Sequence, residues 1–321
     1  MQRSSISVVI PAYNARRFLR QAVDSVWQQS RPPSEVIVVD DCSTDDTGEI
    51  ARQAGAQVIR LPENRGTYVA LNTGIRASHG ELVAHQAADD VWHPDHLAHV
   101  APLLERFPEA GVAFSGVRYT GARNGAWVPT RLPDGEPADA FWPSFTRTVV
   151  PHITAIMRRG IWEKANGYEE SRRAAMDFDF WLRVARLSPF VASHHITADY
   201  RWHEAQISSR PLEQLRSVYW ARNRLLTTLA GESNRELHRQ ALRRLRAIWV
   251  EDMQDAAWRG ELRRGRLLLE MAGRLPGIPW RDRVVQGLRL WTPSRLRPLG
   301  RRLIPQLGQA LPRPSGKTRT I

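Results

Sequence analysis

The sequence has little cysteine and lacks any long apolar run. Cys42 is the only cysteine among 321 residues, so no intramolecular disulfide can form. The first residues reach a β-branched segment without the apolar stretch of a signal peptide, which favours the reducing cytoplasm. Arginines interrupt every apolar window of the last third, well short of the roughly 18 residues that a membrane span needs. We therefore expect a cytoplasmic protein that does not cross a membrane.

Three common signatures of ligand chemistry are also missing. The donor half of the chain contains neither the dinucleotide-binding pattern GxGxxG nor the P-loop pattern GxxxxGK[ST]. These absences argue against a dinucleotide-binding Rossmann domain and against a P-loop enzyme. No histidines and cysteines stand at the spacing of zinc ligands, so any metal would be held by carboxylates.

The net charge of +13 is confined to the last third of the chain. Of the 46 basic and 33 acidic residues, 23 and 9 lie at or after Pro211, which leaves 23 basic and 24 acidic residues before it. The local pattern changes at the same place, from alternating strands and helices to helix alone. We therefore predict a catalytic-type domain over residues 1–210 and a helical, arginine-rich region over residues 211–321.

The first domain alternates strand and helix patterns, which predicts an α/β fold with a mostly parallel sheet flanked by helices. A loop or lid is expected over the proline- and glycine-rich residues 129–143. Strands are expected at residues 6–10, 36–39, 57–61, 81–85, 113–119 and 153–157, and helices at 18–27, after Ser43 or Thr44, at 67–77, after Pro94 and at 178–187.

The second region carries an apolar stripe at helical spacing, and only its last residues, from Arg313, are expected to be disordered. The stripe consists of Leu237, Ala241, Leu245, Ile248 or Trp249, and Met253. A later stripe, Leu296, Leu299, Leu303 and Leu307, lies among Arg295, Arg297, Arg301 and Arg302. Arginine on such helices suits either docking on anionic lipid or a solvated face of a packing helix, and both interpretations stay open.

Acidic pairs follow two predicted buried strands, at the edge where open α/β sheets bind ligands. Asp40 and Asp41 follow the second strand, and Asp89 and Asp90 follow the fourth. One pair alone could simply open a loop, because aspartate is common in turns. Two pairs on one edge favour a site for Mg²⁺ or Mn²⁺, whose remaining ligands would be the oxygens of a diphosphate.

Several motifs then occur in a fixed order over residues 5–208, and together they resemble glycosyltransferase family 2 with the GT-A fold. They are residues 8–14 (VVIPAYN), 38–45 (VVDDCSTD), 63–66 (ENRG), 71–74 (LNTG), 87–95 (AADDVWHPD), 177–183 (DFDFWLR) and 200–203 (YRWH) with Ser208. The resemblance implies inverting transfer from a nucleotide-sugar, most often a UDP-sugar, to a hydroxyl of a glycan or lipid-linked acceptor. Bacterial cell-surface polysaccharide synthesis is the expected setting.

The resemblance also implies a role for each motif. Asp177 would be the catalytic base, and Asp90, Asp89 and His203 would hold Mn²⁺ or Mg²⁺. The acceptor side would be formed by His152, Asp179 and Trp181. The donor would be bound by Pro11, Ala12, Tyr13, Asn14, Asp40, Asp41, Asn64, Gly66, Asn72 and Asp89.

Each of these roles has a plainer alternative. Asp177 could be a helix cap, His203 a partly buried histidine, and the tryptophans part of the core. The chain also departs from the family pattern, with Ala87 in place of an aspartate and Met176 in place of a glutamate.

Two other functions compete with glycosyl transfer. A nucleic-acid-binding protein could use the basic region, but the sequence has no base-reading motif, so no nucleic acid is expected as a partner. A sugar nucleotidyltransferase would need a glycine- and arginine-rich triphosphate loop after the first strand, where this chain has residues 11–14 (PAYN).

Overall fold

The computed structural model describes residues 3–203, 206 and 210–291. The chain divides into two compact units, Met1–Val218 and Tyr219–Ile321. The division falls inside helix α8 (Pro211–Gly231), whose first residue lies at the boundary expected from the change in pattern. The two units are described separately.

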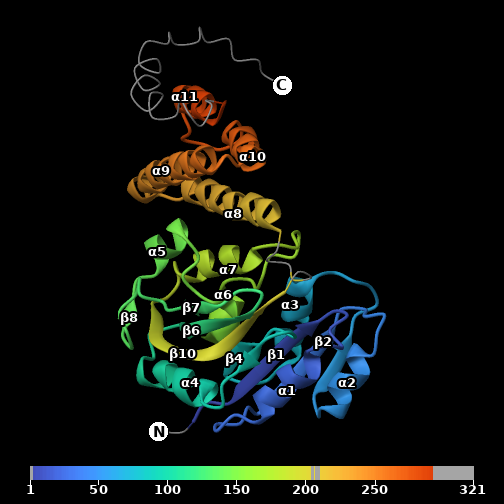
Figure 1. Ribbon diagram of the computed structural model, residues 1–321. Coiled ribbons are helices and arrows are strands. Elements are labelled where there is room, and N and C mark those ends of the chain that lie inside the picture. The colour runs from blue at the N-terminus through green and yellow to red at the C-terminus, as the bar shows by residue number, and fades with distance from the viewer. Residues whose placement is uncertain (1–2, 204–205, 207–209, 292–321) are drawn as a thin grey trace. The chain divides into compact units, whose positions relative to one another are not determined.

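The first unit is built on one mixed, mostly parallel sheet with the strand order β3-β2-β1-β4-β9-β6-β10-β5. Figure 1 labels β1, β2, β4, β6 and β10 of this sheet. Strands β1, β2, β3 and β4 are parallel neighbours, and β6 is parallel to β10, whereas β9 is antiparallel to both of its neighbours. The strands are β1 (Ile6–Ala12), β2 (Glu35–Asp40), β3 (Gln57–Arg60), β4 (Leu82–His85), β5 (Val91–Trp92), β6 (Val112–Gly121), β7 (Gly125–Trp127), β8 (Pro137–Ala138), β9 (Ile156–Arg158) and β10 (Phe190–Trp202). The expected α/β class is confirmed.

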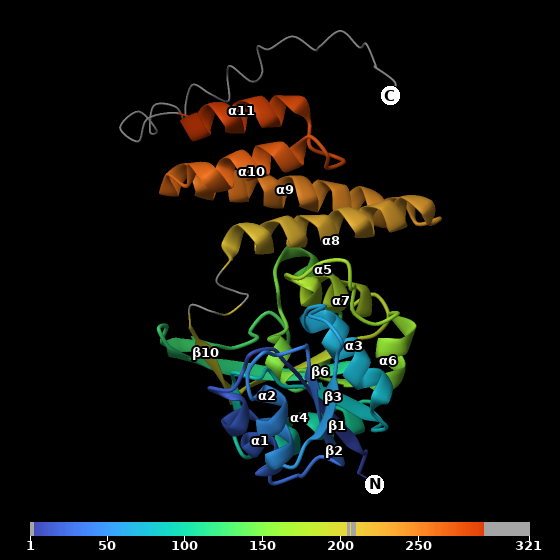
Figure 2. The ribbon, with the colours of Figure 1, turned by 90° about the vertical axis from the view of Figure 1, so that its right-hand side faces the viewer.

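Helices cover both faces of this sheet, which explains why its central strands are apolar at successive positions (Figure 2). Val8 and Ile10 point into the core shared with α1, α2 and α4. Val9 points to the other face, where α3 lies so close that a Cβ on Gly74 would be 2.4 Å from its Cγ1. The helices are α1 (Leu19–Trp27), α2 (Thr47–Gln53), α3 (Thr67–Ala77), α4 (His96–Arg106), α5 (Phe141–Thr146), η1 (His152–Thr154), α6 (Arg159–Lys164) and α7 (Met176–Val184).

The structure differs from the sequence-based expectation in several places, among them the strand expected at residues 153–157, which is a 3₁₀ turn, η1, followed by β9. Strand β1 continues through Pro11 because its pairing with β4 ends at Val9, so the missing N–H of Pro11 leaves no gap in the ladder. The expected loop at residues 129–143 contains β8 and the start of α5. Strand β10 was not expected, since polar residues such as His194 and Asp199 and two register shifts obscure its alternation.

The second unit is helical in its described part, with α9 (Arg235–Arg259), α10 (Leu262–Ala272) and α11 (Trp280–Trp291) after α8. The expected apolar stripe of α9 is buried at Ala241, Leu245, Trp249 and Met253, so Trp249 and not Ile248 completes it. The Trp249 indole N–H donates to the carbonyl of Leu268 in α10, at 2.9 Å. None of the described helices is long and apolar enough to span a membrane. The arginine- and leucine-rich stretch from Arg295 and the tail from Arg313 lie outside the described residues.

Candidate active site

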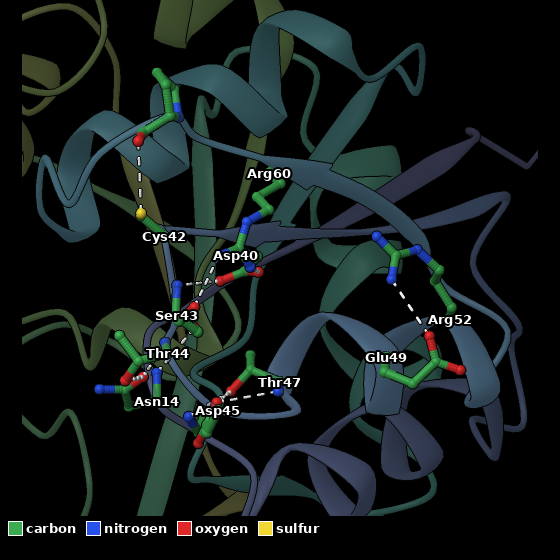
Figure 3. A network of polar contacts seen from close by, with 12 residues as sticks. Asn14, Asp40, Cys42, Ser43, Thr44, Asp45, Thr47, Glu49, Arg52 and Arg60 are labelled. Carbon is green, nitrogen blue, oxygen red and sulfur yellow. Dashed lines mark hydrogen bonds and ion pairs between the residues drawn. The ribbon is translucent and has the colours of Figure 1, made fainter.

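The carboxyl ends of β1 and β2 meet in a network of polar contacts (Figure 3). The Asn14 backbone N–H donates to Ser43 Oγ at 3.0 Å, and its side-chain Oδ1 accepts the Thr44 N–H at 2.8 Å. Asn14 has a φ of 48°, a left-handed conformation that asparagine tolerates better than most residues. Its neighbour Tyr13 is 49% exposed beside this network. The loop after β1 is therefore fixed against the loop after β2 and leaves an aromatic ring in solvent.

Asp40 is fully buried and engaged with the protein. One of its oxygens accepts the Ser43 N–H at 2.8 Å, and the other accepts a hydrogen bond from Arg60 on β3. Arg60 also donates to the Ser43 carbonyl at 2.8 Å. Asp40 thus orders the loop that faces a ligand, rather than offering a free oxygen to it.

Asp41 organises the start of α3 in the same way. Its two oxygens accept the backbone N–H groups of Arg65 and Gly66, each at 2.7 Å. Arg173 holds the other side of this loop by donating to Asn64 Oδ1 at 2.7 Å and to the Asn64 carbonyl at 2.9 Å. The first turn of α3, an element whose N–H groups suit a phosphate, is therefore preformed.

Asn72 has a different place from the one expected. It is 1% exposed, its amide donates to the Tyr168 carbonyl and to Glu170, and its oxygen accepts the Tyr168 N–H. These contacts use all of its usual hydrogen-bonding groups. Asn72 fastens α3 to the segment before α7, so direct donor contact is replaced by a positioning role.

The second acidic pair follows β4, and its two members differ sharply. Asp89 is partly exposed, and its Oδ2 lies 2.8 Å from Nε2 of His203 at the end of β10. Asp90 is 2% exposed and accepts the Arg201 N–H at 2.7 Å. Burial, and then the neighbouring Asp89, raise the pKa of Asp90 well above its usual range. One oxygen of Asp90 is thus used within the protein while Asp89 faces His203, and the expected roles of Asp90, Asp89 and His203 as cation ligands stay predictions.

No group of three or more histidine, cysteine, aspartate or glutamate side chains converges on one point within the described ranges. A carboxylate and an imidazole at 2.8 Å nevertheless suit one Mn²⁺ or Mg²⁺ that takes its remaining ligands from diphosphate oxygens and water. The side chains present therefore fit a cation shared with a phosphorylated ligand, and do not form a closed protein cage.

Asp177 lies in the first turn of α7, one residue inside its start. The N-cap is Ala175, which has a φ of 53°, and no side chain caps the helix. Tyr68 of α3 donates its hydroxyl to Asp177 Oδ1 at 3.3 Å. Burial raises the pKa of the Asp177 carboxyl. A carboxylate that is not the N-cap and has a raised pKa has the properties of a general base.

Of the three side chains expected on the acceptor side, Asp179 and Trp181 are buried and His152 is half-buried. Asp179 is 2% exposed and pairs with Arg183 at 2.8 Å. Trp181 is 3% exposed and contacts Phe190. The two ring nitrogens of His152 are buried without hydrogen-bond partners, and its ring centroid lies 4.1 Å from that of His85. Asp179 and Trp181 thus pack within the protein, and the acceptor contacts expected for the three residues stay predictions.

Comparison with known proteins agrees with this arrangement. The sequence profile of glycosyl transferase family 2 matches residues 7–165. The putative teichuronic acid biosynthesis glycosyltransferase TuaG of Bacillus subtilis is 38% identical over 232 residues, which cover 67% of this chain and 86% of TuaG. An uncharacterized glycosyltransferase of Rickettsia prowazekii is 27% identical over 215 residues, covering 65% and 68%. The chain belongs to glycosyl transferase family 2.

Solved structures support the GT-A fold of this family 2 enzyme. S. aureus TarS 1–349 in complex with UDP-GlcNAc superposes with a TM-score of 0.69 at 16% identity, covering 95% of this chain and 92% of that one. The Pyrobaculum calidifontis mannosyltransferase PcManGT, in complex with GDP-Man and Mn²⁺, gives a TM-score of 0.58 at 18% identity, covering 97% and 87%. Because the chain belongs to glycosyl transferase family 2, glycosyl transfer is the one of the three function classes that holds.

Sequence reasoning missed several residues of this family 2 site. Tyr68, Arg60 and Arg173 contact Asp177, Asp40 and Asn64 from elements far away in the chain. Their positions in the sequence carry no motif signal, because a tyrosine in a helix or an arginine at a strand end is common. Only the three-dimensional contacts reveal that they position the acidic residues and the α3 loop.

Proposed function

We propose that this glycosyltransferase is inverting and metal-dependent, and that it transfers a sugar from a UDP-sugar to a hydroxyl of a glycan or lipid-linked acceptor. Cell-surface polysaccharide synthesis in bacteria is the setting that relatives support. TuaG is named for teichuronic acid biosynthesis, and the E. coli chondroitin synthase is 27% identical over 217 residues, covering 65% of this chain and 30% of the synthase. The observation that carries the proposal is the half-buried Asp177 carboxyl, which accepts a hydrogen bond from Tyr68 and has a raised pKa.

The donor would lie along the edge formed by the loops after β1, β2 and β4. Residues 11–14, with the exposed ring of Tyr13, would contact the nucleotide, and the N–H groups at the start of α3 would face the diphosphate. Asp40, Asp41 and Asn64 would support the donor by fixing these loops. This division separates the residues that touch the donor from those that hold the loops.

Asp89 and His203 would hold Mn²⁺ or Mg²⁺ together with the diphosphate. The cation, when bound, supplies positive charge to the departing diphosphate oxygens. Asp89 is the better placed carboxylate because its oxygen faces His203, whereas Asp90 accepts a backbone hydrogen bond. The contact between Asp89 and His203 also gives a reason for the position of His203 at the end of β10, across from the loop after β4.

Asp177 would take the proton from the acceptor hydroxyl while that oxygen attacks the anomeric carbon. A single displacement of this kind breaks the bond to the diphosphate oxygen and inverts the configuration at the carbon. The hydrogen bond from Tyr68 orients the carboxylate, and the raised pKa makes it a better proton acceptor at neutral pH. The two side chains come from α3 and α7, so the base depends on how these helices are held together.

Asp177→Asn tests the proposal, because asparagine keeps the shape and removes the basicity. We expect turnover to fall by roughly 10²–10⁴, the usual contribution of a general base, with donor affinity in Mn²⁺ near that of the wild type. Asp179→Asn is the matched control, since Asp179 is a buried carboxylate of the same helix that pairs with Arg183. Asp179→Asn should mainly lower the midpoint of thermal unfolding and should have only a small effect on turnover. Near-normal turnover of Asp177→Asn would mean that another group is the base.

A further inference from the structure

Two arginines pack on one phenylalanine next to the contact between Asp89 and His203. The guanidinium carbon of Arg17, just before α1, lies 4.7 Å from the centroid of the Phe18 ring, and that of Arg201, in β10, lies 4.4 Å from the same centroid. The Phe18 and His203 rings are 5.4 Å apart between centroids, and Nε2 of His203 is 2.8 Å from Asp89. Phe18 therefore holds two cationic groups beside the candidate cation site.

The guanidinium group of Arg201 has an unused donor. Its Nη2 donates to the amide oxygen of Gln21 at 2.8 Å, and its buried Nη1 has no hydrogen-bond partner among the described residues. Asp90 accepts the backbone N–H of Arg201, at 2.7 Å, and not its side chain. A buried cationic donor without an acceptor is costly, so a group of this kind needs a partner such as an anion.

Arg17 is exposed, and the carboxylates that contact this part of the chain have other partners. Asp24 of α1 pairs with Arg20 at 2.9 Å. Asp45 accepts backbone N–H groups and a threonine hydroxyl. Neither Arg17 nor Arg201 is therefore paired with a carboxylate of the part of the chain that the structure describes, and both can bind an anion.

We propose that Arg17 and Arg201 bind the diphosphate of the nucleotide-sugar and stabilise it as the leaving group. This inference rests on the proposed function, which places the diphosphate at Asp89 and His203. The diphosphate oxygen keeps the electron pair when its bond to the anomeric carbon breaks, so the diphosphate gains negative charge. Guanidinium groups suit this charge, because they bind phosphate oxygens through two parallel N–H donors and stay protonated.

The arginines also add charge that the candidate cation site alone would lack. Asp89 offsets part of the positive charge of any cation that it binds, so less of that charge is available to the diphosphate. Packing on Phe18 fixes the two guanidinium groups before the nucleotide-sugar binds, so little rearrangement is needed when the bond breaks. Arg17 and Arg201 are therefore expected to contribute to binding of the diphosphate with or without a cation.

Isothermal titration of the full-length protein with UDP, in Mn²⁺ and in a chelator, tests this inference. Arg17→Ala should weaken UDP binding by about tenfold or more under both conditions, because a hydrogen bond between charged groups is lost. Arg17→Lys keeps the positive charge and should restore most of the affinity. Arg201→Gln should weaken UDP binding to a similar extent, and its midpoint of thermal unfolding shows whether the fold is kept.

The matched control is Arg20→Ala. Arg20 lies in the first turn of α1, its side chain is 60% exposed, and it pairs with Asp24, so the variant removes the same charge from the same segment. The control should bind UDP like the wild type. An equal loss of affinity in Arg20→Ala would show an effect of overall charge and would overturn the inference, as would an unchanged affinity in Arg17→Ala. Absence of UDP binding by the wild type would overturn the proposed donor, and this inference with it.

Discussion

Three histidines of the first unit are buried in places that suit only the neutral ring, and this makes stability depend on pH. Burial, the largest cause in each case, lowers the pKa of His96 and of His152 to about 3. Burial, and then the adjacent His152, lower the pKa of His85 well below its usual range. No described carboxylate forms an ion pair with any of the three, and both nitrogens of His85 and of His152 lack hydrogen-bond partners.

The sign and size of the effect follow from these values. An unfolded histidine takes up a proton near pH 6.5, whereas the native His96 and His152 stay neutral until about pH 3. Between these limits the unfolded state binds more protons, so stability is fully present above pH 6.5 and is lost as the pH falls. Each histidine contributes about 1.4 kcal/mol per pH unit, or about 2 kcal/mol between pH 6.5 and 5. Two such residues remove about 4 kcal/mol, a large part of the 5–15 kcal/mol typical of a domain.

Urea unfolding at pH 7.5, 6 and 5, followed by circular dichroism, measures this loss. The histidines should remove about 4 kcal/mol of unfolding free energy by pH 5, and the raised pKa of Asp90 and of Asp177 acts in the opposite direction, so the histidine contribution is read from the difference between wild type and histidine variants. His96→Gln and His152→Gln should each make the dependence on pH shallower, because glutamine does not titrate. His79→Gln, at a side chain that is 87% exposed, controls for the loss of a histidine. A dependence on pH that stays unchanged in the His96 and His152 variants would refute the reasoning.

Three further predictions concern the acidic edge. Isothermal titration measures UDP-sugar affinity with and without Mn²⁺, and Asp89→Ala should abolish the gain in affinity that Mn²⁺ gives. Asp90→Ala should keep that gain but lower the midpoint of unfolding, since the Arg201 N–H loses its acceptor. Asp41→Asn should weaken donor binding by about tenfold, because an amide offers one acceptor oxygen to two backbone donors, and a loss of stability alone would contradict this. Arg173→Ala should raise the KM for the donor more than it lowers kcat, and unchanged KM would show that Asn64 needs no support.

The parts of the fold that could be predicted are those in which burial dictates the sequence. The strand expected at residues 36–39 lies within β2, and the helix expected at residues 67–77 coincides with α3. Strand β10 could not be predicted in this way, because it runs from the core to a partly exposed end and carries polar side chains such as His194 along its length. Strand β5 has two residues, too few for any pattern to show.

The site could be located from the sequence more readily than its roles could be assigned. The position of an acidic residue after a strand indicates which edge of the sheet it occupies, and this was enough to find Asp40 and Asp89. It does not indicate which oxygens are already used by backbone N–H groups. Asn72 illustrates the limit, since its motif position suggests a ligand contact while its amide is buried against Tyr168.

The internal hydrogen bonds of the aspartates have a physical reason if the site binds a diphosphate, as we propose. Negative side chains that all faced the ligand would repel it, because like charges at short range oppose binding. Asp40 is neutralised by Arg60, Asp41 is bound to two N–H groups, and the buried Asp90 accepts a backbone hydrogen bond and has a raised pKa. Of the two acidic pairs, Asp89 is left as the partly exposed carboxylate, beside His203. One carboxylate can bind a divalent cation and leave a net positive charge. The internal contacts of Asp40, Asp41 and Asp90 therefore make the edge able to accept an anionic donor.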